Sequence, residues 1–288
     1  RDFQYPLVDN DCHRVRNEYG VIRALHARGF IAPDALWLET DHQHLPGGDF
    51  IVMRRSPGVC GGTVFQPKNK VSDNIVRTLA KTLANLHTMR PILELAAHTE
   101  SINAERWRMS TERCVRSYIE SWLELLAVTP HLSSPACVSL LIWLLEHVPE
   151  MNGTPSLVHG DVGFHNFLLD DGRLSALLDW EFTHLGDPAE DFAGIRNSAG
   201  TSLDWNLFTR VYEEAGGTAI SAERVHFFQV WGMVRNAVCS VLAAQIFLDG
   251  RADDIKFVLT PHAYVPMFIN AAKKLIETGM NGNHPTSR

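Results

Sequence analysis

One stretch, Leu157 to Ala193, constrains the fold of this chain more than any other part. It contains two short apolar runs, Phe167 to Leu169 and Leu174 to Leu178, and the turn sequence Asp170-Asp171-Gly172 lies between them. An Asp-Gly pair between two apolar runs is typical of a tight β-hairpin. We therefore predict a hairpin whose turn is centred near Asp171, and its two strands must end at a common open edge.

Three polar side chains flank this predicted hairpin. Asn166 precedes its first strand, Asp179 follows its second strand, and Asp161 lies in the loop that leads into it. We expect the three to come together, because the two ends of a hairpin are neighbours in space. They would supply only oxygen ligands, which Mg²⁺ prefers, and the remaining coordination positions would go to water and substrate phosphates.

The intervals between His159, Asp161, Asn166 and Asp179 resemble the catalytic core of kinases, where an H-x-D-x-x-x-x-N loop precedes a metal-binding Asp. The tripeptides H-G-D and D-W-E resemble the aminoglycoside phosphotransferase and choline kinase group of small-molecule kinases. The continuation GDPAEDFA, Gly186 to Ala193, is similar to one branch of that group. The branch holds bacterial phosphotransferase-family proteins and the kinase-like domains fused to some acyl-CoA dehydrogenases.

This resemblance implies an α+β, protein-kinase-like fold with two lobes. Residues 1–56 would be the remnant of a truncated small lobe with its hinge, and residues 57–288 a mainly helical large lobe. The implied activity is ATP- and Mg²⁺-dependent phosphoryl transfer to a hydroxyl group of a small molecule. Asp161 would be the catalytic base, and Asn166 and Asp179 would hold Mg²⁺.

Further residues of the motif have supporting roles in the resembling family. His159 would brace the catalytic loop through hydrogen bonds, and Asp191 would buttress the same loop, although a helix cap also explains an Asp there. Glu181 would face the metal or the acceptor, with a structural ion pair as the alternative. His165 occupies a variable position of the motif, so we expect it to pack or to face solvent.

A different chemistry remains open for the same residues. The side chains of Asp161, Asn166 and Asp179, together with His159 and His184, could form a hydrolase site that binds two metal ions. That alternative does not explain the spacing of the hairpin, so we favour the kinase interpretation.

The resemblance also implies nucleotide contacts near the beginning of the chain. Glu18 lies on the apolar face of a predicted helix, where it would pair with a strand cation that contacts ATP phosphates; a surface Glu is the alternative. The backbone of Met53, Arg54 and Arg55 would bind adenine as the interlobe hinge, although the two arginines also fit solvated charges. Arg1 is the candidate strand cation.

No sequence motif of a Gly-rich phosphate-binding loop is found. The sequence contains neither G-x-G-x-x-G nor a Walker-type motif, and the segment before Glu18 is too short for a kinase Gly-rich hairpin. Since residue 1 is not Met, we expect that the sequence lacks its natural beginning. If the loop is truly absent, a nucleotide-binding pseudokinase is the alternative to an enzyme.

The acceptor is predicted less sharply than the reaction. A helix that carries Arg235 among aromatic residues favours a hydroxylated acid or acyl-type acceptor, but Arg235 could equally pair with Asp191 or another acid. The alternative is an aminoglycoside-type antibiotic kinase. Residues 1–149 hold 16 acidic and 16 basic residues, so the net charge of −7 lies in the second half and permits a cationic acceptor.

Composition limits the other classes of partner and the compartment. The negative charge and the lack of a Lys/Arg run argue against nucleic acid. Five cysteines without a C-x-x-C pair indicate neither a zinc site nor a disulfide scaffold, so we expect a reduced, cytoplasmic protein. The apolar segment Val225 to Leu248 is interrupted by polar residues and is predicted to be a buried helix rather than a membrane span. The oligomeric state is left open.

Hydrophobic periodicity and capping residues predict the remaining elements. Short extended segments are expected at residues 35–40 and 50–53. Helices are expected at residues 13–28, 73–89, 111–127, 135–147, 203–215, 225–248 and 264–278.

Overall fold

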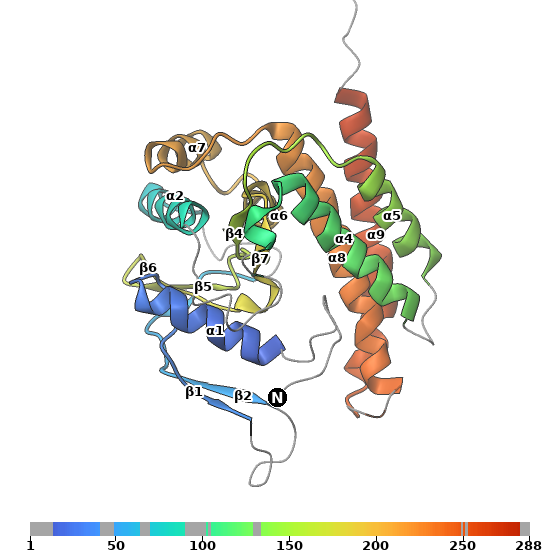
Figure 1. Ribbon diagram of the computed structural model, residues 1–288, viewed down its shortest axis with the longest axis horizontal. Helices are drawn as coiled ribbons and strands as arrows, with labels where there is room; N and C mark the ends of the chain where they lie inside the picture. The colour runs from blue at the N-terminus through green and yellow to red at the C-terminus, as the bar shows by residue number, and fades with distance from the viewer. Residues whose placement is uncertain are drawn as a thin grey trace, which may run out of the picture.

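The computed structural model describes residues 14–40, 49–63, 70–89, 102, 105–128, 134–248, 250 and 253–282. Within them the architecture is α+β, as predicted: it contains three small antiparallel sheets, and a group of long helices lies on one side (Figure 1). The predicted lobe boundary near residue 56 stays a prediction.

The N-terminal part consists of one helix and a two-stranded sheet, with α1 at Arg14–Ala27, β1 at Ala35–Glu39 and β2 at Phe50–Met53. Just beyond the helix end, Gly29 adopts a left-handed φ of +74°. The amide of Phe30 then donates to the carbonyl of Leu25 over 3.0 Å, which closes the last turn. The ring of Phe30 packs edge-on against Trp180, so this part rests on the segment after the hairpin.

The predicted hairpin is present, with β5 at Phe167–Asp170 and β6 at Arg173–Leu177. Positive φ values at Asp171 and Gly172, 47° and 71°, give the left-handed turn that matches the twist of a hairpin. A two-residue strand that the sequence did not predict, β3 at Val59–Cys60, extends this sheet along β5.

A second short ladder connects the regions on either side of the hairpin. Strand β4, Ser156–Val158, pairs antiparallel with β7, His184–Gly186, and both strands are fully buried. The loop after β4 and the helix after β7 therefore begin beside each other. Neither strand was predicted, because three residues are too few to show a period.

The helices follow the predicted order with two corrections. Their bounds are α2 Asp73–Thr88, η2 Arg106–Arg108, α4 Thr111–Val128, α5 Pro135–Glu146, η3 Trp180–Phe182, α6 Ala189–Ala199, α7 Trp205–Glu214, α8 Ala222–Leu248 and α9 Lys256–Gly282. Helix α6 was not predicted as a helix. Helix α9 begins well before the predicted Tyr264 and continues through Pro261 and Pro266.

Figure 1 shows α8 and α9 lying side by side, with α4 and α5 beside them and α2 and α7 on the opposite side of β4, β7 and α6. One window of α8, Ala222–Gln245, is long and apolar enough to cross a membrane, but 72% of it is buried inside the protein. Trp231 of α8 packs edge-on against Tyr118 and Trp122 of α4. Helix α8 is thus a core helix whose aromatic side chains include one packed against α4.

Candidate active site

The two ends of the hairpin meet as the sequence predicts. Phe167 pairs with Leu177, and one step further the amide of Leu178 donates to the carbonyl of Asn166 over 2.9 Å. Asp179 follows directly with a φ of +66°, an uncommon value that Asp tolerates, and the chain turns there into η3. Asn166 and Asp179 therefore leave the same edge of the sheet.

Asp161 lies next to Asn166 in the loop between β4 and β5. The side-chain amide of Asn166 donates to the backbone carbonyl of Asp161 over 2.9 Å and to its Oδ2 over 3.0 Å. The imidazole Nε2 of His165 lies 3.3 Å from the same Oδ2. On the other side, Nη2 of Arg235 donates to Oδ1 over 2.9 Å. Both carboxylate oxygens are thus engaged.

These contacts keep the carboxyl group of Asp161 ionised. Burial alone raises the pKa of Asp161, but the hydrogen bond from His165 and the charge of Arg235 outweigh it and hold the pKa well below its ordinary value. The buried guanidinium of Arg235 gains from the same pair, since Asp161 and Glu190 raise its pKa above its already high value. Asp161 is available as an acceptor of hydrogen bonds at any physiological pH.

Asp191 of α6 stabilises the loop that contains His159, Gly160 and Asp161. Its side chain is fully buried. Its two carboxylate oxygens accept from the backbone amides of His159, 3.0 Å, and Gly160, 2.9 Å. His87 of α2 also donates to Asp191 over 2.9 Å and accepts from the hydroxyl of Tyr212. Asp191 thus lies where the predicted buttress of the loop should be.

His159 uses both ring nitrogens inside the protein. Its Nε2 donates to the carbonyl of Leu178 over 2.9 Å, and its Nδ1 accepts from the amide of Asp161 over 3.2 Å. Burial lowers the pKa of His159, so the ring is neutral and can accept at Nδ1. It connects the loop before the hairpin to the end of the hairpin.

Gly160 is required by the packing of this loop. It adopts a φ of +82°, and a Cβ atom there would lie 2.5 Å from the carbonyl oxygen of Phe182. Both the conformation and the space exclude a side chain. This close approach explains why the motif reads His-Gly-Asp.

The arrangement does not support a hydrolase that binds two metals. His159 is occupied as described, and His184 places Nδ1 on the carbonyl of Phe182 and Nε2 3.2 Å from Glu190 while it stacks on Tyr118. Among the residues that the structure describes, no three His, Cys, Asp or Glu side chains are grouped to hold a metal ion. An Asp and an Asn with water and phosphates remain compatible with Mg²⁺.

Comparison with known proteins identifies the family. Residues 9–228 match the model of the phosphotransferase enzyme family. The chain belongs to this family. Membership of this family supports phosphoryl transfer to a hydroxyl group as the activity of this part of the protein.

The relatives agree with this assignment. Acyl-CoA dehydrogenase family member 11 of Rattus norvegicus is 28% identical over 187 residues, which cover 64% of this chain and 23% of the rat protein. This chain thus spans about a quarter of the length of that relative.

Solved structures show the same fold. A Ralstonia eutropha protein assigned to the aminoglycoside phosphotransferases gives a TM-score of 0.62 at 24% identity, over 90% of this chain and 83% of that one. An aminoglycoside 2′-phosphotransferase in complex with GDP gives 0.59 at 15% identity, over 92% and 82%. The protein-kinase-like fold predicted from the motif is therefore confirmed.

The residues predicted to contact the nucleotide lie in different surroundings. Glu18 is half-buried on α1, Met53 and Arg55 are exposed after β2, and Arg1 lies outside the described residues. The backbone amide of Arg54 donates to the carbonyl of Asp34 over 2.9 Å, and its side chain binds the carboxylate of the same residue. The predicted adenine contacts of this hinge stay a prediction.

His165 differs from its predicted surroundings: it was expected to pack or face solvent, but it reaches the carboxylate of Asp161. Arg235, for which an acceptor contact or a pair with Asp191 or another acid was considered, pairs with another acid, Asp161. It also contacts the carbonyl of Gly160 and, at 3.8 Å, Glu190. Glu181 is half-buried within η3, and its predicted contact with metal or acceptor stays a prediction.

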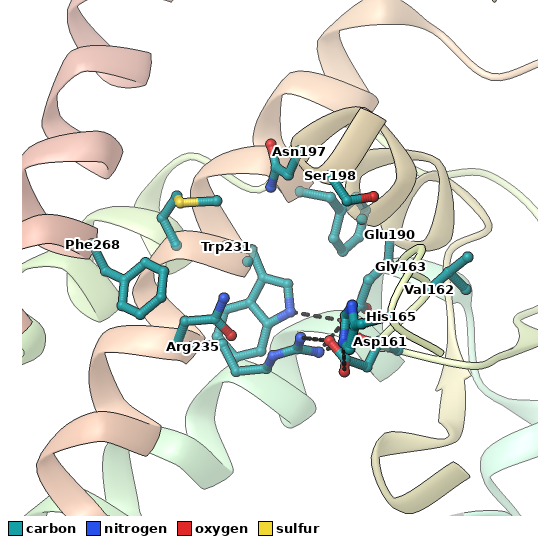
Figure 2. A pocket seen from close by; sticks show the side chains of 16 residues that line it. Asp161, Val162, Gly163, His165, Glu190, Asn197, Ser198, Trp231, Arg235 and Phe268 are labelled. Carbon is teal, nitrogen blue, oxygen red and sulfur yellow. Dashed lines mark hydrogen bonds and ion pairs between the residues drawn. The ribbon is translucent and has the colours of Figure 1, made fainter. Parts of the chain in front are cut away.

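A pocket between α6, α8 and α9 opens beside Asp161 (Figure 2). Its carboxylates are Asp161 and Glu190, and both face Arg235. Glu190 also accepts from the indole of Trp231 over 2.9 Å. The remaining walls are aromatic rings and neutral polar groups, including Phe228, Trp231, Phe268, Asn197, Ser198 and Asn236.

Proposed function

We propose that this protein transfers the γ-phosphoryl group of ATP, with Mg²⁺, to the hydroxyl group of a small hydroxylated acyl-type acceptor. One observation carries the proposal: the ionised carboxylate of Asp161 lines the pocket between α6 and α8, while Asn166 binds it from the hairpin side. The acceptor hydroxyl and the nucleotide phosphates would thus meet at Asp161. The relatives with bound nucleotide, one solved with GDP and one with ADP and hygromycin B, support a nucleotide as phosphoryl donor.

The residues at the hairpin edge fit a magnesium ion. The amide nitrogen of Asn166 points at two oxygen atoms of Asp161, which fixes the orientation of the amide and leaves its oxygen on the other side. With the carboxylate of Asp179 this gives two hard oxygen ligands. Mg²⁺ held there would neutralise the charge of the β- and γ-phosphates.

Asp161 would orient the acceptor in the transfer step. The acceptor oxygen forms a bond to the γ-phosphorus, the bond from that phosphorus to the β-phosphate oxygen breaks, and ADP leaves. The hydroxyl proton passes to Asp161 and then to water. Since the pKa of Asp161 is depressed, the carboxylate is a weak base and takes the proton late, once the acceptor oxygen has bonded to phosphorus.

The lining of the pocket favours an acceptor without several positive charges. An aminoglycoside carries multiple ammonium groups, which require uncompensated carboxylates. Here Asp161 and Glu190 already share Arg235, and the other walls are aromatic or neutral. An apolar chain that carries a hydroxyl group fits these walls better, because it buries apolar surface and leaves no charge unpaired.

A screen of donors and acceptors tests the proposal. The protein is incubated with Mg-ATP or Mg-GTP and with three acceptor classes, namely hydroxy acids, hydroxyacyl thioesters and kanamycin, and phosphorylated product is measured by mass spectrometry. We expect product from the hydroxyacyl class, none in EDTA, and little from Asp161→Asn. Preferred turnover of kanamycin would contradict the acceptor class. Nucleotide binding without any transfer would instead favour the pseudokinase alternative.

A further inference from the structure

Arg235 and His165 hold the carboxylate of Asp161 from its two opposite oxygens. Arg235 of α8 donates to Oδ1 over 2.9 Å, and His165 lies 3.3 Å from Oδ2, which also accepts from Asn166. We infer that Arg235 and His165 are positioning residues that fix Asp161 so that one of its lone pairs remains directed at the acceptor hydroxyl. The inference rests on the proposed function, because it requires Asp161 to contact the acceptor.

The hydrogen-bond capacity of a carboxylate supports this role. An ionised carboxylate offers about four lone-pair sites. Oδ2 of Asp161 meets two donors, the groups of His165 and Asn166, and Oδ1 meets Arg235. One site on Oδ1 is left, and Asp161 lines the pocket between α6 and α8. A hydroxyl group that donates there is held in one orientation instead of several.

Arg235 is built into the protein for this contact. Its side chain is only 6% exposed, its guanidinium lies 4.7 Å from the ring centre of Phe182, and it also contacts the carbonyl of Gly160. A buried arginine is expensive unless it is paired, and its carboxylate partners here are Asp161 and the more distant Glu190. The helix thus delivers a fixed positive charge to the catalytic loop.

The position of His165 depends on the absence of a side chain at Gly163. A Cβ atom at Gly163 would lie 2.5 Å from Cε1 of His165 and 2.6 Å from its Nδ1. Gly163 therefore makes room for the ring to fold back onto Asp161. An alanine there would displace the imidazole while leaving it in the protein.

Double-mutant cycles with Asp161 test Arg235. We expect Arg235→Met to lower kcat by roughly ten- to a hundredfold, with the KM for ATP little changed and with partial rescue in Arg235→Lys. In an Asp161→Asn background the same change should have almost no further effect, because the group it positions is gone. Equal losses in both backgrounds would overturn the inference.

The control for a purely structural effect is Arg224→Met. Arg224 also lies on α8 and forms a buried pair, with Asp187, but it does not contact the catalytic loop. We expect it to lower the Tm without lowering kcat at a temperature where the protein is folded. A general destabilisation lowers activity only through the amount of protein that is folded at the assay temperature. If the loss of activity in Arg235→Met were fully explained in this way, the positioning role would be wrong.

Gly163→Ala and His165→Ala test the other contact, between His165 and Oδ2 of Asp161. Both should lower kcat by a similar factor, and the double variant should be no worse than either single variant, because each removes the same contact. Additive losses, or no loss in Gly163→Ala, would contradict the role of His165. A failure of the proposed function is distinguished from these outcomes, since full activity of Asp161→Asn alone would refute Asp161 as the base.

Discussion

Arg235 and Asp161 lie 74 residues apart in the sequence, yet their side chains are joined by a hydrogen-bonded ion pair of 2.9 Å. This pair connects α8, a core helix, to the loop that carries the candidate catalytic base. Together with the hydrogen bond from His165, this pair explains how a carboxylate lining a partly apolar pocket remains ionised. The same pair also withdraws Arg235 from direct recognition of an acceptor.

Asp161→Asn tests the catalytic base. The substitution keeps the shape of the side chain but removes the charge that orients the acceptor hydroxyl, so turnover should fall by about 10²–10⁴. The affinity for Mg-ATP should change little, because in the proposed mechanism Asp161 contacts the acceptor and not the phosphates. Steady-state kinetics and calorimetry on the same preparation separate the two effects. An equal loss of nucleotide affinity would make Asp161 a metal ligand.

Asp179→Ala tests the metal site. We expect it to abolish Mg²⁺-dependent binding of ATP in calorimetry, because the uncompensated phosphates would no longer be neutralised. Asp171→Asn is the matched control: it removes the same charge from the exposed turn of the same hairpin, where Asn tolerates the left-handed conformation. Unchanged Mg-ATP affinity in Asp179→Ala would refute the assignment.

Asp191→Asn tests the support of the catalytic loop. An amide cannot accept from His159, Gly160 and His87 at both of its ends, so one donor would face an NH₂ group. We expect the free energy of unfolding to fall by about 2–4 kcal/mol, the range for breaking a buried charged network. Chemical denaturation at neutral pH measures it. A loss below about 0.5 kcal/mol would show that Asp191 does not brace the loop.

The effect of Asp191 should also depend on pH. Although burial raises the pKa of Asp191, the hydrogen bond and charge of His87 lower it by more, so its pKa in the folded state lies below its ordinary value. A depressed pKa stabilises the folded state above the unfolded-state pKa, and this stability is lost as the pH falls. The difference between wild type and Asp191→Asn should therefore shrink from about pH 5 downward. Denaturant midpoints across that range would show it.

Substitutions at Gly232 of α8 test the proposed acceptor pocket without changing Asp161 itself. It lines the pocket, and an added Cβ would meet only Asn197, at an ordinary contact distance of 3.4 Å. Gly232→Ala should stabilise the helix by about 0.5–1 kcal/mol, and Gly232→Leu should raise the KM of the acceptor while leaving nucleotide affinity intact. If acceptor kinetics were unchanged in Gly232→Leu, the acceptor would bind elsewhere.

The hairpin and the positions of the residues that flank it were predictable because the sequence signals for them are local. The turn residues fix the register of β5 and β6, and the register alone brings Asn166 to Leu178 and Asp179. By contrast, no helix was predicted in the stretch from Gly186 to Ala193, which carries the resemblance to one branch of the family. Its residues from Ala189 onward form the start of α6, which is buried on nearly all sides and therefore shows no alternation of polar and apolar faces.

The two residues that hold Asp161 could not be assigned from the sequence for a different reason. His165 lies in the loop beside its partner, but only the space left by Gly163 directs the ring inward. The partner of Arg235 depends on how α8 packs against α6, which is a tertiary relationship without a local signal. A charged residue within an apolar helix indicates that a buried partner exists, but the sequence does not identify which acid is that partner.

The contact between Gly160 and the carbonyl of Phe182 has a consequence for how this loop tolerates change. Any substitution at position 160 would have to push away the backbone that follows Asp179, so a residue that contacts no ligand would disturb both ends of the site at once. A saturation library should therefore recover almost nothing but glycine there, in contrast to the exposed Arg54. Transplanting an H-R-D loop into this protein would accordingly require rebuilding the segment around Phe182 as well.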